Sequence, residues 1–242
     1  MLFEDLSLSK SIQRAVFEEG YTNPTPIQEK AIPIVLAGKD LVGCAQTGTG
    51  KTAAFAIPII HNLHRMVGSS KKTKQIRCLV VTPTRELAVQ IGESFDTYGK
   101  YTNLRQLTIF GGVSQVPQVD QLKKGVDILI ATPGRLLDLH KQGFLDFDHL
   151  HFLVLDESDL MLDMGFIPDI ENICTKLPTT RQTLLFSATM PESVFRMAKS
   201  ILNDPITINS YNDYKALLPK ANVIISAEER KSIIINKINE IL

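Results

Sequence analysis

The chain has 242 residues, 44% of them hydrophobic, so it is long enough to bury a sizeable core. Its 26 basic and 26 acidic side chains balance, so any contact with phosphate must come from a local patch, not from the overall field. No signal-peptide pattern opens the sequence, and no apolar run approaches the roughly 20 residues of a membrane-spanning helix. Cys44, Cys78 and Cys174 lack metal-ligand spacing, which is typical of free thiols in a reducing compartment. We therefore expect a cytoplasmic protein with no membrane segment.

Short apolar runs alternate with helix-like segments along the chain. The apolar runs are nearly continuous in Val, Ile, Leu or Phe, which is typical of strands buried on both faces. The sequence therefore predicts an α/β domain with a mainly parallel, twisted sheet flanked by helices on both faces. The predicted strands are 40–44, 77–81, 106–110, 127–130, 152–155, 183–186 and 206–208, and the clearest helix-like segments are 9–19, 27–36, 85–98 and 192–202.

The character of the sequence changes near Asn209. Residues 1–208 hold the strand and helix alternation, so we assign them to one domain. Residues 209–242 are interpreted as a linker followed by the start of another βα unit, with a strand at 222–226 and an amphipathic helix at 228–242. The polar segment Ser69–Lys74 is read as a solvated loop tip, with a nucleic-acid contact as the alternative.

The most informative stretch is a glycine-rich turn between a strand and a helix-like run. Such a turn directs backbone N–H groups and the helix dipole at an anion, which favours phosphate binding. Lys51 is expected to reach the β- and γ-phosphates, and the Thr52 hydroxyl to hold Mg²⁺. A flexible Gly-Thr turn is the alternative, because the generic pattern has Gly at the first position. The residues concerned are Ala45, Gln46, Thr47, Gly48, Thr49, Gly50, Lys51 and Thr52.

Polar and glycine-rich segments follow most of the predicted strands. Ligands of parallel α/β sheets bind beyond the carboxyl ends of the strands, so these segments are expected to share one active face. The pair Asp156-Glu157 ends a buried strand, where Asp156 could hold Mg²⁺ through water and Glu157 could orient or deprotonate an attacking water. An acidic strand-end turn or helix cap is the alternative. The segments are 45–52, 83–85, 111–112, 132–135, 156–159 and 187–189.

The set of motifs over residues 1 to about 208, and the order in which they occur, resemble those of the first RecA-like domain of a DEAD-box RNA helicase. Gly20–Gln28 resembles the Q motif, with Phe3 as its upstream aromatic, and Ala45–Thr52 resembles the helicase form of motif I, which explains Ala45. The compact set resembles the bacterial RhlE-like branch. The further segments correspond to motif Ia (83–88), the glycine doublet (111–112), motif Ib (132–135), motif II (156–159, followed by 161–166) and motif III (187–189).

This resemblance implies a RecA-like P-loop fold that binds ATP and Mg²⁺. Gln28 would read adenine, because a side-chain amide offers both donor and acceptor, and Tyr21 would stack on the base. Without the resemblance, Gln28 would be read as an exposed helix residue. Phe3 is expected to pack behind this site. The residues that the resemblance implies for catalysis are Lys51, Asp156 and Glu157.

The resemblance also implies a groove for single-stranded RNA. Short hydroxyls, glycine backbones and helix N-termini suit phosphates and sugars, so binding would be independent of base sequence. Ser187 and Thr189 are expected to hydrogen-bond Asp159 and couple the two sites; a simple turn is the alternative. Helix-start caps are a compatible second interpretation of the groove residues, which are Pro83, Thr84, Arg85, Gly111, Gly112, Thr132, Pro133, Gly134 and Arg135.

Two positions depart from the family pattern. Ser158 stands where the family has Ala, and a buried, unpaired hydroxyl there would cost about 1–3 kcal/mol. We expect ATP hydrolysis to survive this change. Leu160 stands where the family often has a charged residue, so we do not carry over the family's contacts between its two domains at this position.

The sequence holds no stretch like His-Arg-Ile-Gly-Arg, which the family's second RecA-like domain supplies to the ATPase site. We expect this chain alone to be a monomer that binds nucleotide weakly and unwinds RNA negligibly. Unwinding would be coupled to ATP hydrolysis when the second domain is present. A superfamily 2 DNA helicase or translocase domain and a non-catalytic nucleotide-binding scaffold remain as alternatives.

Overall fold

The computed structural model describes residues 2–67 and 75–209. The predicted polar loop at 69–74, strand at 222–226 and helix at 228–242 lie outside the described residues. They stay predictions, as does the domain boundary near residue 209.

All seven predicted strands are present and form one parallel sheet. The sheet order is β3-β4-β2-β5-β6-β1-β7. Each strand begins and ends within one residue of its predicted range. The strands are β1 Leu41–Cys44, β2 Cys78–Val81, β3 Gln106–Ile109, β4 Ile128–Ala131, β5 Phe152–Leu155, β6 Gln182–Ser187 and β7 Ile206–Asn209.

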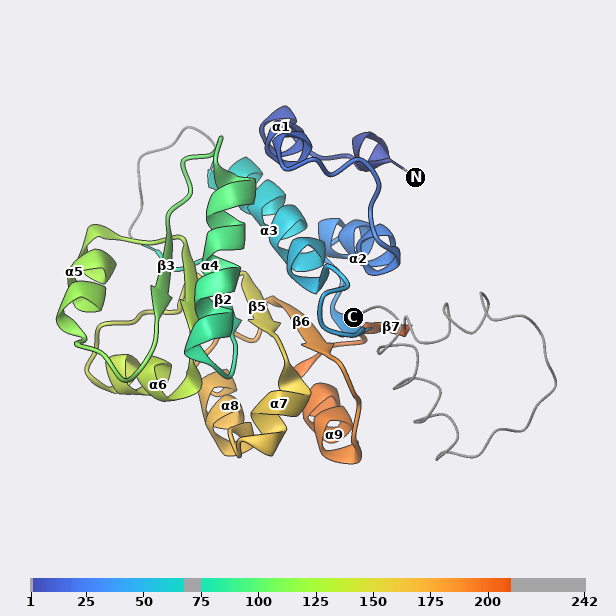
Figure 1. The fold of residues 1–242 in the computed structure, drawn as a ribbon. Helices are drawn as coiled ribbons and strands as arrows, with labels where there is room; N and C mark the ends of the chain where they lie inside the picture. Colours follow the sequence, from blue (N-terminus) through green and yellow to red (C-terminus); the bar gives the residue numbers. More distant parts are fainter. Residues whose placement is uncertain (1, 68–74, 210–242) are drawn as a thin grey trace, which may run out of the picture. The chain divides into compact units, whose positions relative to one another are not determined.

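Helices cover both faces of this sheet, as the sequence predicts (Figure 1). A short 3₁₀ turn, Phe3–Asp5, precedes the first α-helix. The four helix-like segments taken from the sequence correspond to α1, α2, α4 and α9. The helices are α1 Lys10–Glu18, α2 Pro26–Leu36, α3 Lys51–Val67, α4 Arg85–Gly99, α5 Val116–Lys124, α6 Pro133–Lys141, α7 Ser158–Asp163, α8 Ile167–Cys174 and α9 Glu192–Ile201.

Two apolar cores lie on opposite faces of the sheet. Successive strand side chains point to opposite faces, so within β2 Val80 joins one core and Leu79 joins the other. The first core packs the strands against α1–α4, and the second packs them against α5–α9. Burial on both faces explains why the inner strands β1, β2, β4 and β5 are apolar without alternation, whereas the edge strands β3 and β7 are more exposed.

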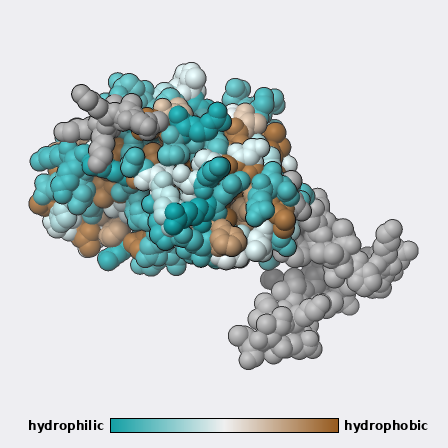
Figure 2. Space-filling view, turned by 90° about the horizontal axis from the view of Figure 1, so that it is seen from above, coloured by the Kyte–Doolittle hydropathy of each residue, from teal (hydrophilic) through white to brown (hydrophobic). Residues whose placement is uncertain are grey.

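Exposed apolar side chains are scattered over the described surface. Figure 2 shows the molecule of Figure 1 from above. On this face, hydrophilic side chains cover most of the surface, with separate apolar patches between them. Phe17 and Val116 are among the most exposed apolar residues. In the described part of the chain, no helix is long and apolar enough to cross a membrane.

Gly43 allows β1 and β6 to pack beside each other. Gly43 and Phe186 are register partners, and a Cβ at Gly43 would lie 2.7 Å from two atoms of the Phe186 ring. This approach leaves no room for a side chain, so the glycine is required by packing.

We therefore expect Gly43→Ala to lower the free energy of unfolding by about 1–3 kcal/mol, because the methyl group overpacks the core. Urea denaturation measures the change. Gly111→Ala is the matched control, because a Cβ at Gly111 meets nothing within 4 Å. Equal stability of the two variants would contradict the packing argument.

Candidate functional site

The glycine-rich segment 45–52 connects β1 to the N-terminus of α3. Gly48 and Gly50 adopt φ angles of 81° and 92°, in the left-handed region that favours glycine. A Cβ at Gly50 would also collide with the Gln28 side-chain amide. Gly50 is therefore fixed by its backbone angle and by the close approach of a neighbour.

The segment that precedes α2 supports this loop. The Thr25 hydroxyl donates to the Thr49 carbonyl at 2.8 Å, and Gln28 Nε2 donates to the Gly50 carbonyl at 3.2 Å. Gln28 Oε1 also accepts from the Thr25 N–H at 2.9 Å, within a capping box. Gln28 is only 4% exposed, so the alternative of an exposed helix residue is wrong. The role of Thr25 was missed, although the Thr-Pro-Ile-Gln capping pattern was a signal for it.

Tyr21 lies between two other aromatic residues. Its ring stacks on that of Phe3, with centroids 6.0 Å apart, and its hydroxyl lies 3.2 Å from that of Tyr98. Phe3 is buried, whereas Tyr21 is exposed. Phe3 therefore supports Tyr21 from behind, and stacking of Tyr21 on a base stays a prediction.

A buried ion pair joins the glycine-rich loop to the end of β5. Lys51 is 5% exposed, and its Nζ lies 2.8 Å from Glu157 Oε1. Glu157 has a φ of 53°, a left-handed conformation that costs a non-glycine residue of the order of 1–3 kcal/mol. Such strain is typical of functional sites, and here it occurs at the residue that pairs with Lys51.

Asp156 is a second buried carboxylate beside this pair. Burial raises its pKa to about 7, the Glu157 charge adds to the increase, and Lys51 opposes it. Among the described residues, its Oδ1 atom has no hydrogen-bond partner. An unpaired carboxylate oxygen suits a hard cation such as Mg²⁺. The described residues hold no cluster of three or more His, Cys, Asp or Glu side chains that could bind a metal, so a cation here would need phosphate and water ligands as well.

Strand β6 lies between β1 and β5 and ends at Ser187. Ser187 is the register partner of Cys44, and its Oγ accepts from the Asp159 N–H at 3.1 Å. Asp159 Oδ2 accepts from the Thr189 N–H and hydroxyl, each at 2.8 Å. Burial alone would raise the pKa of Asp159, but its hydrogen bonds with Thr189 and Ser187 outweigh burial and lower that pKa. The contacts expected of Ser187 and Thr189 are therefore present, and their coupling role stays a prediction.

A groove of about 650 Å³ lies beyond the ends of β2, β3 and β4. Most of the predicted RNA-binding residues line it, whereas Gly112 and Pro133 do not. Sequence reasoning missed five lining residues, because their acidic or apolar side chains do not suit phosphate. The predicted residues that line it are Pro83, Thr84, Arg85, Gly111, Thr132, Gly134 and Arg135, and the missed ones are Glu86, Phe110, Asp138, Met164 and Phe166.

Two helix N-termini open at this groove. Thr84 caps α4 by accepting from the Leu87 N–H at 3.3 Å, and Thr132 is the N-cap residue of α6. A capped helix N-terminus still carries partial positive charge, so capping and phosphate binding are compatible here.

Ser158, the unusual residue of the acidic segment, is fully buried, and its Oγ has no hydrogen-bond partner among the described residues. We expect Ser158→Ala to raise the free energy of unfolding by about 1–3 kcal/mol, because the unpaired hydroxyl is removed. Urea denaturation measures this change.

Ser187→Ala is the matched control, because that buried hydroxyl accepts from Asp159 and its loss should lower stability. A destabilised Ser158→Ala variant would show that the Ser158 hydroxyl has a partner.

Comparison with known proteins gives four findings. The sequence profile of the family described as DEAD/DEAH box helicase matches residues 25–197. The DEAD-box ATP-dependent RNA helicase RhpA of Helicobacter pylori (strain B128) is 51% identical over 207 residues, which cover 86% of this chain and 41% of that protein. CshA of Geobacillus kaustophilus, also named a DEAD-box ATP-dependent RNA helicase, is 46% identical over 203 residues, which cover 84% of this chain and 42% of that protein.

The crystal structure of a DEAD box protein from Methanococcus jannaschii superposes with a TM-score of 0.79 and 36% identity, covering 90% of this chain and 62% of that one. The chain thus spans about two fifths of the length of these curated relatives. Assignment to the RhlE-like branch stays a prediction. Because the family profile matches residues 25–197, and the parallel sheet and the Lys51–Glu157 pair agree with that match, the chain belongs to the DEAD/DEAH box helicase family and carries its RecA-like fold.

Proposed function

We propose that this chain is the ATP-binding domain of an ATP-dependent RNA helicase, cytoplasmic and monomeric. The observation that carries the proposal is the meeting of Lys51, Glu157 and Asp156 beside the glycine-rich loop. Two relatives that are named ATP-dependent RNA helicases support it. As an enzyme, the protein would couple ATP hydrolysis to local RNA unwinding when a second RecA-like domain is present.

The nucleotide phosphates would lie against the backbone N–H groups at the start of α3. Lys51 would turn from Glu157 to the phosphate oxygens, since both partners are anionic. Glu157 would then be free to orient the attacking water and accept its proton. Thr52 and Asp156 would hold Mg²⁺, which neutralises charge on the phosphates when bound. The loop residues Ala45, Gln46, Thr47, Gly48, Thr49 and Gly50 would complete the cradle.

Gln28 and Tyr21 would recognise the adenine base. In the structure the Gln28 amide gives one N–H to Gly50 and one lone pair to Thr25. A glutamine amide has two N–H donors and two lone pairs on oxygen, so one donor and one acceptor remain for the base. Tyr21 is exposed and supported by Phe3, as a stacking platform requires.

The groove beyond β2, β3 and β4 would bind the backbone of single-stranded RNA. The N-termini of α4 and α6 and the exposed Arg85 suit phosphate groups, which are the same for every base sequence. Gly112 and Pro133 would shape the loops from outside the lining. Asp159, Ser187 and Thr189 would couple this groove to the nucleotide site.

We expect Lys51→Ala to abolish measurable MgATP binding in an isothermal titration, because the buried cation that faces the phosphates is lost. Lys39→Ala, at an exposed lysine before β1, is the matched control and should bind normally. Equal affinities of the Lys51→Ala variant and the unsubstituted chain would contradict the proposal and favour a non-catalytic scaffold.

We further expect the chain to bind an oligoribonucleotide more tightly than the corresponding DNA strand at one fixed salt concentration. A single hydrogen bond to a 2′-hydroxyl, worth about 1 kcal/mol, corresponds to a preference of about five-fold. Fluorescence anisotropy with labelled strands measures it. Equal affinities, or a preference for DNA, would favour a DNA translocase domain instead.

A further inference from the structure

Arg85 reaches the groove without help from a carboxylate. It is exposed, and in the described part of the chain no acidic group lies within ion-pair distance of its guanidinium. Its contact is instead with an aromatic ring, since its Cζ lies 4.7 Å from the centroid of Phe110. This cation–π contact holds a flexible side chain in place and leaves its N–H donors available.

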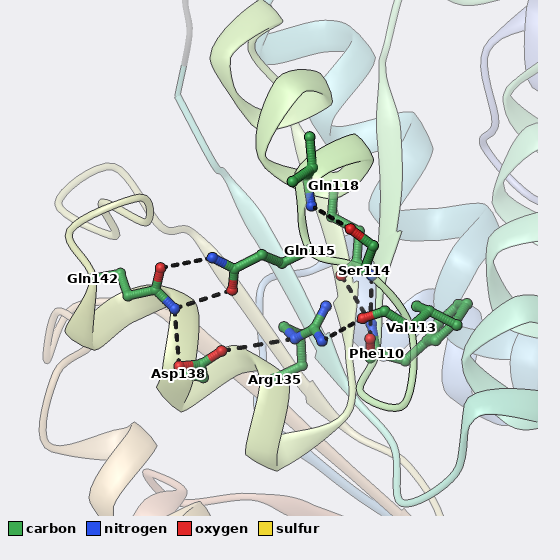
Figure 3. A network of polar contacts seen from close by, with 9 residues as sticks. Phe110, Val113, Ser114, Gln115, Gln118, Arg135, Asp138 and Gln142 are labelled. Carbon is green, nitrogen blue, oxygen red and sulfur yellow. Dashed lines mark hydrogen bonds and ion pairs between the residues drawn. The ribbon is translucent and has the colours of Figure 1, made fainter.

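Phe110 in turn is held by a buried glutamine. The parallel register of β3 ends at Ile109, so the main chain of Phe110 lies just beyond the sheet. Gln118, on α5, bonds both main-chain polar groups of Phe110: its Oε1 accepts from the Phe110 N–H at 3.3 Å, and its Nε2 donates to the Phe110 carbonyl at 3.2 Å (Figure 3). Gln118 is 8% exposed, so it is sheltered from water while it makes these two bonds.

Phe110 begins the loop between β3 and α5, and the other end of this loop is fixed to α6. Arg135 donates to the Val113 carbonyl at 2.9 Å, and its side chain is only 10% exposed. Gln115 and Gln142 exchange two amide hydrogen bonds, of 2.9 and 3.1 Å (Figure 3). The loop that begins at Phe110 is therefore anchored at both ends, so the Phe110 ring has a defined place.

We propose that Gln118 is a positioning residue for RNA binding: it fixes Phe110, whose ring orients the Arg85 guanidinium towards the groove. The inference rests on the proposed function, because Arg85 must contact an RNA phosphate for its orientation to matter. Gln118 itself touches no RNA in this scheme. Its contribution is pre-organisation, which reduces the entropy lost when Arg85 binds.

The test is equilibrium binding of a labelled oligouridylate to the 242-residue chain at several salt concentrations. Gln118→Met keeps the side-chain volume but cannot bond both main-chain groups of Phe110. We expect a loss of RNA affinity of about two- to five-fold, the scale of an exposed cation–π contact. The slope of log K against log salt should become shallower, by up to about 0.7 for one lost phosphate contact.

Non-additivity separates positioning from a general structural role. Arg85→Gln should show the same shallower slope, and Gln118→Met added to it should cause no further loss. Phe110→Leu removes the ring but not the Gln118 contacts, so it should reproduce the effect if Gln118→Met fails to fold. Gln121→Met, at an exposed position of the same helix, is the matched control and should bind as the unsubstituted chain does.

Several outcomes would overturn the inference. One is full RNA affinity in a folded Gln118→Met or Phe110→Leu variant; another is an equal further loss in the Arg85→Gln background. If Arg85→Gln weakens binding while Gln118→Met does not, only this inference fails. If Arg85→Gln leaves affinity and slope unchanged, or the unsubstituted chain binds no RNA, the proposed RNA contact fails as well.

Discussion

The buried ion pair between Lys51 and Glu157 is the constraint on which the site depends. An unpaired charge at either position would cost several kcal/mol, so each residue requires the other in the described structure. The pair can form because β6 alone separates the strands that lead to Lys51 and Glu157. An anionic phosphate could replace Glu157 as the partner of Lys51, and the strained Glu157 backbone would then present a free carboxylate.

Strand order also divides the carboxyl edge into two regions. The strands β5, β6 and β1 are neighbours and carry the lysine and the carboxylates, whereas β3, β4 and β2 are neighbours and carry the groove. Ser187 ends β6, Thr189 follows it, and both bond Asp159 in the segment that follows β5. These hydrogen bonds connect the end of β6 to the acidic segment that follows β5.

Local pattern was sufficient for the strands and for the loops that follow them, because a strand buried on both faces is apolar throughout. Contacts between distant segments could not be predicted in this way. The support of Gly50 by Gln28 depends on how α2 packs beside the loop, and the left-handed backbone of Glu157 has no sequence signal. Arg135 lines the groove, and its RNA contact stays a prediction. Its near burial and its bond to the Val113 carbonyl had no sequence signal, because they depend on how the loop after β3 packs on α6.

The most direct test is a crystal structure of the chain with Mg²⁺ and a non-hydrolysable ATP analogue. The account predicts phosphates against the start of α3, with Lys51 Nζ moved from Glu157 to a phosphate oxygen and the cation near Thr52 and Asp156. An analogue bound elsewhere, or bound at this loop with the Lys51–Glu157 pair intact, would contradict the account.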